Sequence, residues 1–297
     1  MNRIEICDVL PRKERALDMK PVLSMIRGKR VAITGAGGYI GSELARQIAD
    51  FQPECLTLID NCEHNLYQIA RQIDGVCTMN VAFGDVRDAI RMVLLLRKQD
   101  LVFHAAAMKH VTMCEENPTE ANETNVNGTF NVVSSCRCPV VLVSTDKAVN
   151  PTSHMGRTKR EAEQIVLETG RGAVVRFGNV LGSSGSVFPL FVEQIERGGP
   201  VTVTHPDVER WFMTVGEAAE LILQAGAHGP GTYILDMGSP VKILNLAQDM
   251  IALSGTRYPI QIQITGLKPG ERLKELLWYD DEDLVDIGID GVMMARA

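Results

Sequence analysis

Four consecutive polar residues, Ser144-Thr145-Asp146-Lys147, carry the densest chemistry in the sequence. They end an apolar run, 140–145, of the kind that predicts a buried strand. Ligands of open α/β sheets bind at the carboxyl ends of strands, and an acid beside an amine there supplies a proton donor and a proton acceptor in one site. The residues therefore indicate an acid–base site at Asp146 and Lys147, with a strand-end turn carrying two solvated charges as the alternative.

A glycine-rich segment, Thr34–Gly41 (TGAGGYIG), leads from the apolar run that starts at 30 into a helical pattern. Glycines permit a tight turn and let backbone approach a pyrophosphate, which N–H groups at a helix N-terminus bind. Asp60 ends the next strand, 19 residues after Gly41, where a carboxylate accepts hydrogen bonds from ribose hydroxyls. The pattern predicts a dinucleotide site rather than a plain glycine turn. Its predicted cofactor contacts are Gly35, Gly38, Tyr39, Ile40 and Gly41.

Asp60 also bears on the choice between NAD and NADP. A carboxylate repels the 2′-phosphate of NADP, and residues 61–65 (NCEHN) include no arginine or lysine that could hold that phosphate. The sequence therefore favours NAD.

Further candidate contacts follow the third and fourth strands. Asp85 and Val86 come where an acceptor could meet the adenine amino group, with capping of the next helix as an equal alternative. Ala105 and Ala106 are small enough to let a flat dinucleotide lie against the backbone. Lys109, just beyond, could bind a phosphate or a substrate hydroxyl, or be a solvated lysine.

Met155 and Lys159 stand four residues apart at the start of a predicted helix. This spacing puts both side chains on one helix face, so Lys159 can reach back toward Asp146. An exposed helix lysine is the alternative.

The elements that must position these side chains alternate along the chain. Near-continuous apolar strands between helices predict an α/β, doubly wound parallel sheet of the Rossmann type, covered on both faces. Strands are predicted at 30–37, 55–60, 76–82, 101–107, 140–145, 173–177 and 233–236, and helices at 39–51, 63–73, 88–98, 118–135 and 153–169. Glycines and prolines punctuate shorter elements after 178, which predicts a smaller C-terminal lobe that includes a helix at 243–253 and a strand at 260–265.

We expect the chain to divide into three parts. Residues 1–28 form an irregular leader, and residues 29–178 with about 230–240 form the dinucleotide-binding domain. Residues of about 179–229 and 241–297 form a substrate-binding lobe.

Composition excludes several classes of protein. With 45% hydrophobic and 23% charged residues in 297, the chain can fold around a sizeable core. A net charge of −7 argues against general binding to nucleic acid or anionic lipid. No apolar run approaches the roughly 20 residues that cross a bilayer, and the start of the chain lacks a signal-peptide core, so a cytoplasmic protein is expected. Seven cysteines without a CxxC pair predict reduced thiols and no metal site.

Together the motifs resemble those of the extended short-chain dehydrogenases/reductases, and within them the polysaccharide-biosynthesis branch of the nucleotide-sugar 4,6-dehydratases. The resemblance runs from about Gly28 to Trp278. The segments that carry it are Thr34–Gly41, Gly84–Asp88, His104–Val111, Thr124–Thr129, Ser144–Lys159, Val175–Ser186, Arg210–Glu217 and Gly266–Glu275. The segment Asp8–Arg12 resembles the junction after the membrane-spanning region of long, membrane-anchored members, so membrane association is expected if the chain is part of a longer one.

The resemblance implies a lyase of surface polysaccharide or glycan biosynthesis. It implies NAD-dependent loss of water from UDP-N-acetylglucosamine, giving the 4-keto-6-deoxy sugar with retained configuration. NAD takes a hydride from C4 and returns it to C6. Lys147 removes the C5 proton, Asp146 protonates the departing C6 hydroxyl, and Thr145 hydrogen-bonds the C4 oxygen. Lys159 holds the nicotinamide ribose.

The resemblance also implies residues that place the two ligands. Lys109 and Asn125 contact the cofactor, and Lys109, Asn179, Arg210 and Lys268 contact the sugar nucleotide. Helices of this superfamily commonly pair between subunits, so a homo-oligomer is expected.

Met155 departs from the superfamily pattern, which has a tyrosine there as the C4 base. A thioether cannot take a proton, although methionine also occurs here in the long dehydratases, whose branch it therefore favours. The C4 base stays open between Asp146 and Lys159, and we favour Asp146 acting at both C4 and C6.

Two other functions are compatible with the sequence. A nucleotide-sugar 4-epimerase, or another NAD-dependent sugar-nucleotide oxidoreductase, needs the glycine-rich turn but not the acid and amine at Asp146 and Lys147. An inactive dinucleotide-binding sensor or scaffold is supported by Met155 alone.

Overall fold

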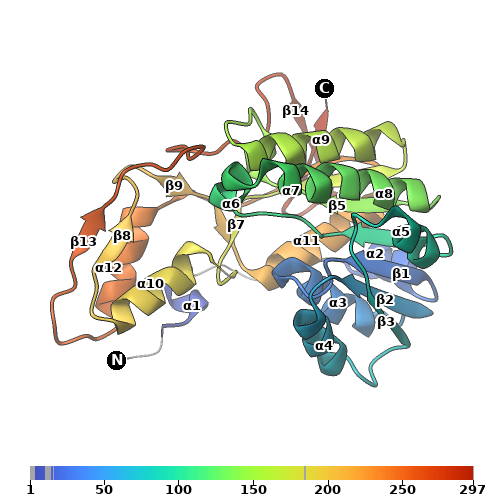
Figure 1. Ribbon diagram of the computed structural model, residues 1–297, viewed down its shortest axis with the longest axis horizontal. Coiled ribbons are helices and arrows are strands. Elements are labelled where there is room, and N and C mark those ends of the chain that lie inside the picture. Colours follow the sequence, from blue (N-terminus) through green and yellow to red (C-terminus); the bar gives the residue numbers. More distant parts are fainter. Residues whose placement is uncertain (1–3, 11–14, 16, 184, 297) are drawn as a thin grey trace.

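The computed structural model describes residues 4–10, 15, 17–183 and 185–296. It consists of a central sheet with helices on both faces and a smaller lobe beside it, to the left in Figure 1. Three residues of the predicted motif segments, Pro11, Arg12 and Ser184, lie outside the described residues.

Within the described residues the central sheet has nine strands, in the order β14-β15-β11-β6-β5-β4-β1-β2-β3. The strands from β11 to β3 in this order run parallel to their neighbours. Their bounds are Arg30–Thr34 (β1), Cys55–Asp60 (β2), Met79–Phe83 (β3), Leu101–His104 (β4), Val140–Val143 (β5), Gly172–Arg176 (β6) and Gly231–Leu235 (β11). The order reverses between β1 and β4, which is where ligands of such sheets bind. The predicted doubly wound sheet is confirmed.

Each face of the sheet packs against its own helices, because alternate strand residues point to opposite sides. Val31 and Ile33 belong to the core under α2, α3, α4 and α11, whereas Ala32 belongs to the core under α5, α8 and α9. These helices are α2 (Lys20–Ile26), α3 (Tyr39–Asp50), α4 (Glu63–Gln72), α5 (Ala89–Leu96), α8 (Gly128–Ser135), α9 (His154–Glu168) and α11 (Val215–His228). Burial on both faces fixes the strand ends that carry the site.

The lobe has a hydrophobic core of its own, which includes Phe191, Leu246 and Met250. It is built from α10 (Val187–Glu196), α12 (Ile243–Leu253) and three short strand pairs. The pairs are β7 (Asn179–Val180) with β10 (Phe212–Met213), β8 (Val201–Val203) with β13 (Ile262–Ile264), and β9 (Glu209–Arg210) with β12 (Val241–Lys242).

Parts of the expected division are wrong. The leader is not wholly irregular: it contains α1 (Ile6–Val9) and α2, whose Val22 and Ile26 are fully buried against the sheet core. Helix α11, placed in the lobe from sequence, packs on the sheet, where Leu221 belongs to the sheet core. Residues 283–296 also leave the lobe, because β14 (Asp283–Ile289) and β15 (Val292–Arg296) extend the sheet by an antiparallel hairpin.

The long helix predicted at 118–135 is divided by a π-helical turn. It consists of α7 (Pro118–Asn122), the turn η1 (Glu123–Asn127) and α8, and α6 (Val111–Glu116) precedes it. Such turns inside helices occur frequently at functional sites. Among the described residues, no helix has the length and apolar character needed to cross a membrane.

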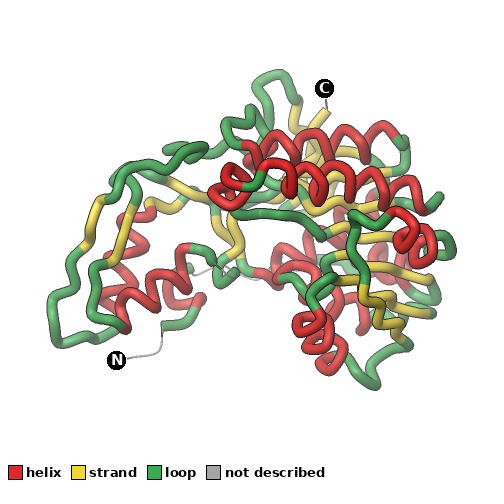
Figure 2. Tube along the Cα trace, in the orientation of Figure 1, coloured by secondary structure: helices red, strands yellow, loops and turns green. Residues whose placement is uncertain are grey.

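A segment without helix or strand, residues 265–282, connects β13 in the lobe with β14 in the sheet, as Figure 2 shows along the top of the molecule. We refer to it as the strap. It returns the chain from the lobe to the edge of the sheet.

Candidate active site

The turn between β1 and α3 depends on glycine for its shape. Gly35 has a φ of 69°, and a Cβ there would lie 2.6 Å from the backbone nitrogen of Ala106. The amide of Ala105 donates to the carbonyl of Thr34 at 3.0 Å, so the ends of β1 and β4 meet closely. No side chain of the described residues caps the N-terminus of α3, whose first N–H groups are available to an anion. The turn therefore fits a pyrophosphate.

The other predicted residues of the turn hold its geometry. Gly38 donates its N–H to the carbonyl of Gly35 at 3.0 Å, and a Cβ at Gly41 would collide with the same carbonyl oxygen. The hydroxyl of Tyr39 donates to the carbonyl of Leu181 at 2.8 Å, which ties the turn to the lobe. Ile40 packs against the sheet core. Burial raises the pKa of Tyr39 and keeps its hydroxyl protonated.

Asp60 lies at the end of β2, directly against the turn. Its two carboxylate oxygens accept from the amides of Gly37 and Cys62, each at 2.8 Å. Each oxygen retains a second lone pair, so ribose hydroxyls can still donate to this carboxylate. The position fits the predicted role, and the ribose contact itself stays a proposal.

Asp85 is paired inside the protein. It accepts hydrogen bonds from the Arg87 guanidinium, one of them at 2.6 Å, and from the Asn61 amide at 3.1 Å. The Arg87 hydrogen bonds are the main cause that lowers the pKa of Asp85 to about 2. The predicted alternative, capping of the next helix, is wrong, because Asp88 caps α5 by accepting from the Arg91 amide. Val86 is buried and lies against Gly128.

Thr145, Asp146 and Lys147 come together just after β5, in a short 3₁₀ turn, η2 (Asp146–Ala148). Asp146 is fully buried, and its Oδ1 accepts from Lys147 Nζ and from the Thr145 hydroxyl, each at 2.9 Å. Its Oδ2 is buried with no hydrogen-bond partner among the described residues. Lys147 Nζ also lies 3.4 Å from Oδ1 of Asn179. The arrangement is an ion pair whose carboxylate keeps unused acceptor capacity.

Lys159 is buried, as its position on the helix face predicts. The alternative, an exposed helix lysine, is wrong. Its Nζ donates to the carbonyl of Val143, at the end of β5, at 2.7 Å. Burial lowers the pKa of Lys159 to about 8, while the charge of Glu163 opposes the shift. Met155 is buried in a small apolar cluster with Cys114 and Ala121 and offers no proton-accepting group.

Asn125, predicted to contact the cofactor, is committed to the protein. Its amide oxygen accepts from the Met108 amide at 2.8 Å, and its NH₂ donates to the Met108 carbonyl and the Thr158 hydroxyl. All three contacts lie within 3.0 Å. Asn125 therefore clamps the segment that follows β4, and its contact with the cofactor stays a prediction.

A hydrogen-bonded chain that includes His104 supports the same strand end. Because the Thr129 hydroxyl donates to the Asn125 carbonyl, it can only accept from Nε2 of His104, at 2.9 Å. Nδ1 of His104 then accepts from the Thr34 hydroxyl at 2.6 Å. Burial lowers the pKa of His104 to about 3, so the ring is neutral and links β1 to β4.

Three predicted substrate contacts differ in their surroundings. Arg210 is buried, and its guanidinium donates to the carbonyls of Glu209, Arg272 and Leu273. It also lies 3.4 Å from the Glu271 carboxylate, so Arg210 clamps the strap, and its contact with the diphosphate stays a prediction. Lys109 and Lys268 are exposed side chains.

The sequence analysis missed a buried ionic network beneath the turn. Glu163 on α9 binds Arg176 through two hydrogen bonds of 2.9 and 2.8 Å and accepts from the Ser144 hydroxyl at 2.5 Å. Arg176 also binds Glu282 of the strap at 2.9 Å. The one sequence signal is that Glu163 lies four residues after Lys159, on the same helix face. We refer to Glu163, Arg176 and Glu282 as the ionic network.

The strap lies directly on the loop that carries the reactive residues. Arg272 donates to the carbonyls of Val149 and Asn150, and the Tyr279 hydroxyl donates to the Ala148 carbonyl at 2.9 Å. Part of the site is therefore closed by residues that come more than 120 positions later in the chain.

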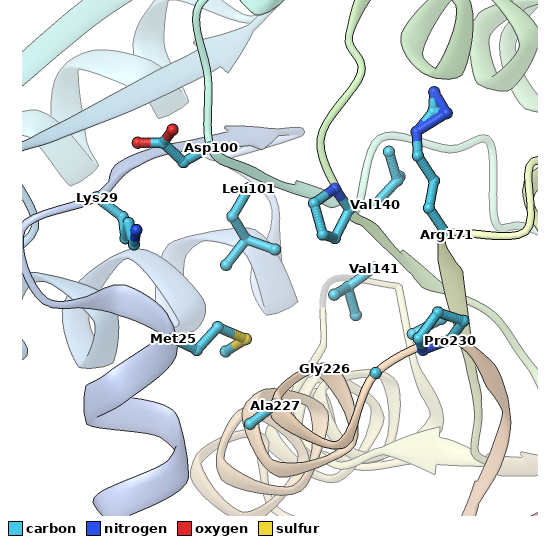
Figure 3. A pocket seen from close by; sticks show the side chains of 13 residues that line it. Met25, Lys29, Asp100, Leu101, Val140, Val141, Arg171, Gly226, Ala227 and Pro230 are labelled. Carbon is cyan, nitrogen blue, oxygen red and sulfur yellow. The ribbon is translucent and has the colours of Figure 1, made fainter.

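A cavity of about 380 Å³ lies at the opposite edge of the sheet, where β4, β5 and β6 begin (Figure 3). Leu101, Val140 and Ala173 line it beside α11. Its arginine, Arg171, uses its guanidinium on the carbonyls of residues 133, 136 and 138. This cavity is far from the acid–base chemistry and is not the candidate site. In the described part of the chain, no group of three or more acidic, histidine or cysteine side chains could hold a metal ion.

Comparison with known sequences gives a consistent result. A family described as "Polysaccharide biosynthesis protein" matches residues 31–297. The "Probable polysaccharide biosynthesis protein EpsC" of Bacillus subtilis is 46% identical over 293 residues, 93% of this chain and 49% of that protein. The "UDP-N-acetylglucosamine 4,6-dehydratase (inverting)" of Campylobacter jejuni strain 81-176 is 31% identical over 276 residues, 87% of this chain and 80% of that protein. The chain thus spans about half the length of EpsC.

A solved structure, Pen from Bacillus thuringiensis, has the same fold. It superposes with a TM-score of 0.83 at 32% identity and covers 91% of this chain and 90% of its own. The match includes the lobe as well as the sheet, since it covers nearly the whole chain.

Proposed function

The chain belongs to the polysaccharide biosynthesis protein family, and on that premise we propose that it is an NAD-dependent sugar-nucleotide 4,6-dehydratase acting on UDP-N-acetylglucosamine. The relative from Campylobacter jejuni supports this choice of substrate. Retention of configuration at C5 is the outcome we expect from Met155, which occupies the position of the usual tyrosine.

The observation that carries the proposal is the contact between the buried Asp146 and the partly buried Lys147, 2.9 Å from Oδ1 to Nζ. Loss of water across C5 and C6 needs a base for the C5 proton and an acid for the C6 oxygen. The two side chains supply these groups in one water-poor turn. A 4-epimerase needs neither group, so this contact favours a dehydratase.

The residues of the glycine-rich turn would hold the cofactor. The uncapped N-terminus of α3 would bind the pyrophosphate, and Asp60 would accept from the adenosine ribose. Bound there, NAD would supply the hydride acceptor for C4 and, once reduced, the hydride donor for C6. Lys159 would hold the nicotinamide ribose from the end of β5.

Asp146 is our candidate for the C4 base. It is ion-paired and thus ionised, and its Oδ2 keeps unused acceptor capacity. Asp146 would take the C4 hydroxyl proton and later give it to the departing C6 oxygen. Thr145 would turn its one hydroxyl proton from Asp146 to the C4 oxygen. Lys147 would remove the C5 proton after losing its own ammonium proton. Lys159 is the alternative C4 base, since its lowered pKa leaves part of it neutral near pH 8.

The test is to incubate the protein with NAD and UDP-N-acetylglucosamine and to measure the product by mass spectrometry and proton NMR. A product lighter by one water, with retained C5 configuration, is expected. An epimer of unchanged mass would replace the proposal by a 4-epimerase, and no product would favour a binding protein. Arg157→Ala, an exposed change on α9, is the matched control.

A further inference from the structure

The leader, residues 1–28, contacts both the lobe and the sheet. At its start, α1 lies against α12, and Ile4, Ile6 and Val9 pack on the hydrophobic core of the lobe. Further along, Met19 packs on the core of the sheet, and Ile26 of α2 is part of that core. The leader is therefore docked on both parts of the molecule through side chains that are close together in the sequence.

Arg15 fastens the leader to the sheet through three carboxylates. Its guanidinium lies 2.7 Å from Asp290, 2.8 Å from Asp236 and 3.4 Å from Glu217. Asp290 stands in the turn between β14 and β15, Asp236 follows β11, and Glu217 belongs to α11. Gly291 leaves room for the arginine, because a Cβ there would lie 2.9 Å from its Cζ. A single surface ion pair contributes little to stability, but three carboxylates around one mostly buried guanidinium form a network, which we refer to as the Arg15 socket.

Ile6 lies at the opposite anchor, where the lobe meets the glycine-rich turn. A Cβ on Gly182 would lie 2.7 Å from Cδ1 of Ile6 and 2.8 Å from the hydroxyl oxygen of Tyr39. That hydroxyl donates to the carbonyl of Leu181, so Ile6 packs beside the contact that ties α3 to the lobe. The contact comes directly after β7, which carries the predicted substrate residue Asn179. Ile6 therefore supports the loop that leads from this residue into the lobe.

The two anchors are joined by a short piece of chain. Arg15 comes five residues after Leu10, which packs on the core of the lobe. Five residues span at most about 18 Å even when fully extended. While both anchors are docked, this length limits how far the lobe can move from the sheet, and each anchor keeps the other at a high effective concentration. Release of one anchor removes the limit and weakens the docking of the other.

We propose that the leader is a strut that holds the lobe closed on the sheet, with Ile6 and the Arg15 socket as its two anchors. The strut holds the loop after β7 against the glycine-rich turn, so Ile6 and Arg15 are positioning residues for the sugar nucleotide, a consequence that rests on the proposed function. The sugar nucleotide would be held between the lobe and the sheet, and its affinity then depends on closure. NAD would be held by the glycine-rich turn and Asp60 of the sheet, and its affinity does not.

The activity test compares wild type with Ile6→Ala, Arg15→Ala and the double variant. Each single variant should raise KM for UDP-N-acetylglucosamine by about fivefold or more, with kcat and the Kd of NAD unchanged. Because either change releases the same strut, the double variant should raise KM no further than the larger single effect, whereas independent residues would multiply their effects. Arg27→Ala and Ile90→Ala are the matched controls, since both side chains are exposed.

A KM like that of wild type in both single variants would overturn the inference. Effects that multiply in the double variant would overturn it as well, because the two anchors would then act separately. An equal loss of NAD affinity would show a general structural defect in place of a positioning role. Absence of product from wild type would instead contradict the proposed function, and a measurement without substrate then decides whether the strut exists.

Hydrogen–deuterium exchange of the protein without ligands is that measurement. In α1 the amide of Leu10 donates to the carbonyl of Ile6 at 3.0 Å. Peptides that cover residues 4–10 should exchange at least about fivefold faster in Arg15→Ala than in wild type or Arg27→Ala, because loss of the socket undocks α1 from the lobe. Equal exchange in wild type and Arg15→Ala would overturn the inference, whether or not the enzyme is active.

Discussion

Two acid–base clusters lie next to each other at the carboxyl ends of β5 and β6, and they differ in how completely they are hydrogen-bonded. In the ionic network, Glu163 uses both oxygens on Arg176, and Arg176 also binds Glu282. In the reactive turn, Asp146 shares one oxygen with Lys147 and Thr145 and leaves the other without a partner. Because a buried polar atom without a partner costs stability, the second arrangement indicates a site kept for chemistry. The first holds that site in place.

The strongest test of this contrast is Lys147→Ala. Loss of the C5 base should lower turnover by about 10³-fold and abolish deuterium exchange at C5. The free energy of unfolding should fall as well, because Asp146 stays buried without its cation, but by less than about 3 kcal/mol because the Lys147 side chain is partly exposed. Turnover and urea unfolding, measured on the same sample, check the expected loss of activity and the expected change in stability. Arg157→Ala serves as the control, and wild-type turnover in Lys147→Ala would remove Lys147 from the mechanism.

Asp146→Asn sharpens the same contrast for the first step. The amide keeps the shape but cannot accept the C4 proton, so both water loss and transient NADH formation in a single turnover should fall by about 10²-fold or more. Stopped-flow absorbance of NADH is the measurement. If NADH still forms at the wild-type rate, the C4 base is Lys159.

A change in the ionic network should lower the free energy of unfolding. Arg176→Met leaves the buried Glu163 with Arg160, a partly exposed cation at 3.2 Å, as its remaining ionic partner, which should cost about 3 kcal/mol in the free energy of unfolding. Urea denaturation measures this loss. The double variant Glu163→Gln/Arg176→Met should recover part of it, since no buried charge remains uncompensated. A loss below about 1 kcal/mol in the single variant would contradict the assigned role.

Lys159 should make stability depend on pH in alkaline solution. Its folded pKa, about 8, lies below the ordinary 10.5, so the unfolded chain binds more protons between these values and stability rises with pH. The free energy of unfolding of wild type, relative to Lys159→Met, should increase by about 3 kcal/mol from pH 8 to 10.5. Chemical denaturation at four pH values would show it. A constant difference would mean that Lys159 is not a buried amine.

Asp60→Ala should give the smallest effect. It should weaken NAD binding and narrow the preference over NADP by about tenfold, because the repulsion of a 2′-phosphate is removed. Titration calorimetry with both cofactors measures the ratio. If wild type binds NADP at least as tightly as NAD, Asp60 does not select the cofactor.

The sequence predicts well those features whose signal is local. The apolar strands, the glycine turn and Asp60 lie within about 30 residues of one another, and the reactive turn is contiguous at 144–147. Pattern alone could not show that Glu282 pairs with Arg176, 106 residues earlier, or that Tyr279 binds the carbonyl of Ala148. These contacts exist only after the strap has crossed from the lobe to the sheet.

Residue type alone does not decide between two partners that suit the same side chain. The guanidinium of Arg210 could bind a diphosphate or backbone carbonyls, and in the structure it binds carbonyls. The amide of Asn125 is likewise used on Met108. The C-terminal hairpin was missed because its β-rich pattern does not reveal which sheet it joins.

The path of the chain through the lobe has a consequence for evolution. The lobe consists of two excursions, one between β6 and α11 and one between β11 and β14, and each begins and ends on the sheet. Because β8 pairs with β13 and β9 with β12, the two excursions form one lobe, and insertions in its exposed loops can change what it binds without shifting the register of the sheet. Replacement of one whole excursion would require a matching change in the other, so we expect the two to diverge together around one sheet.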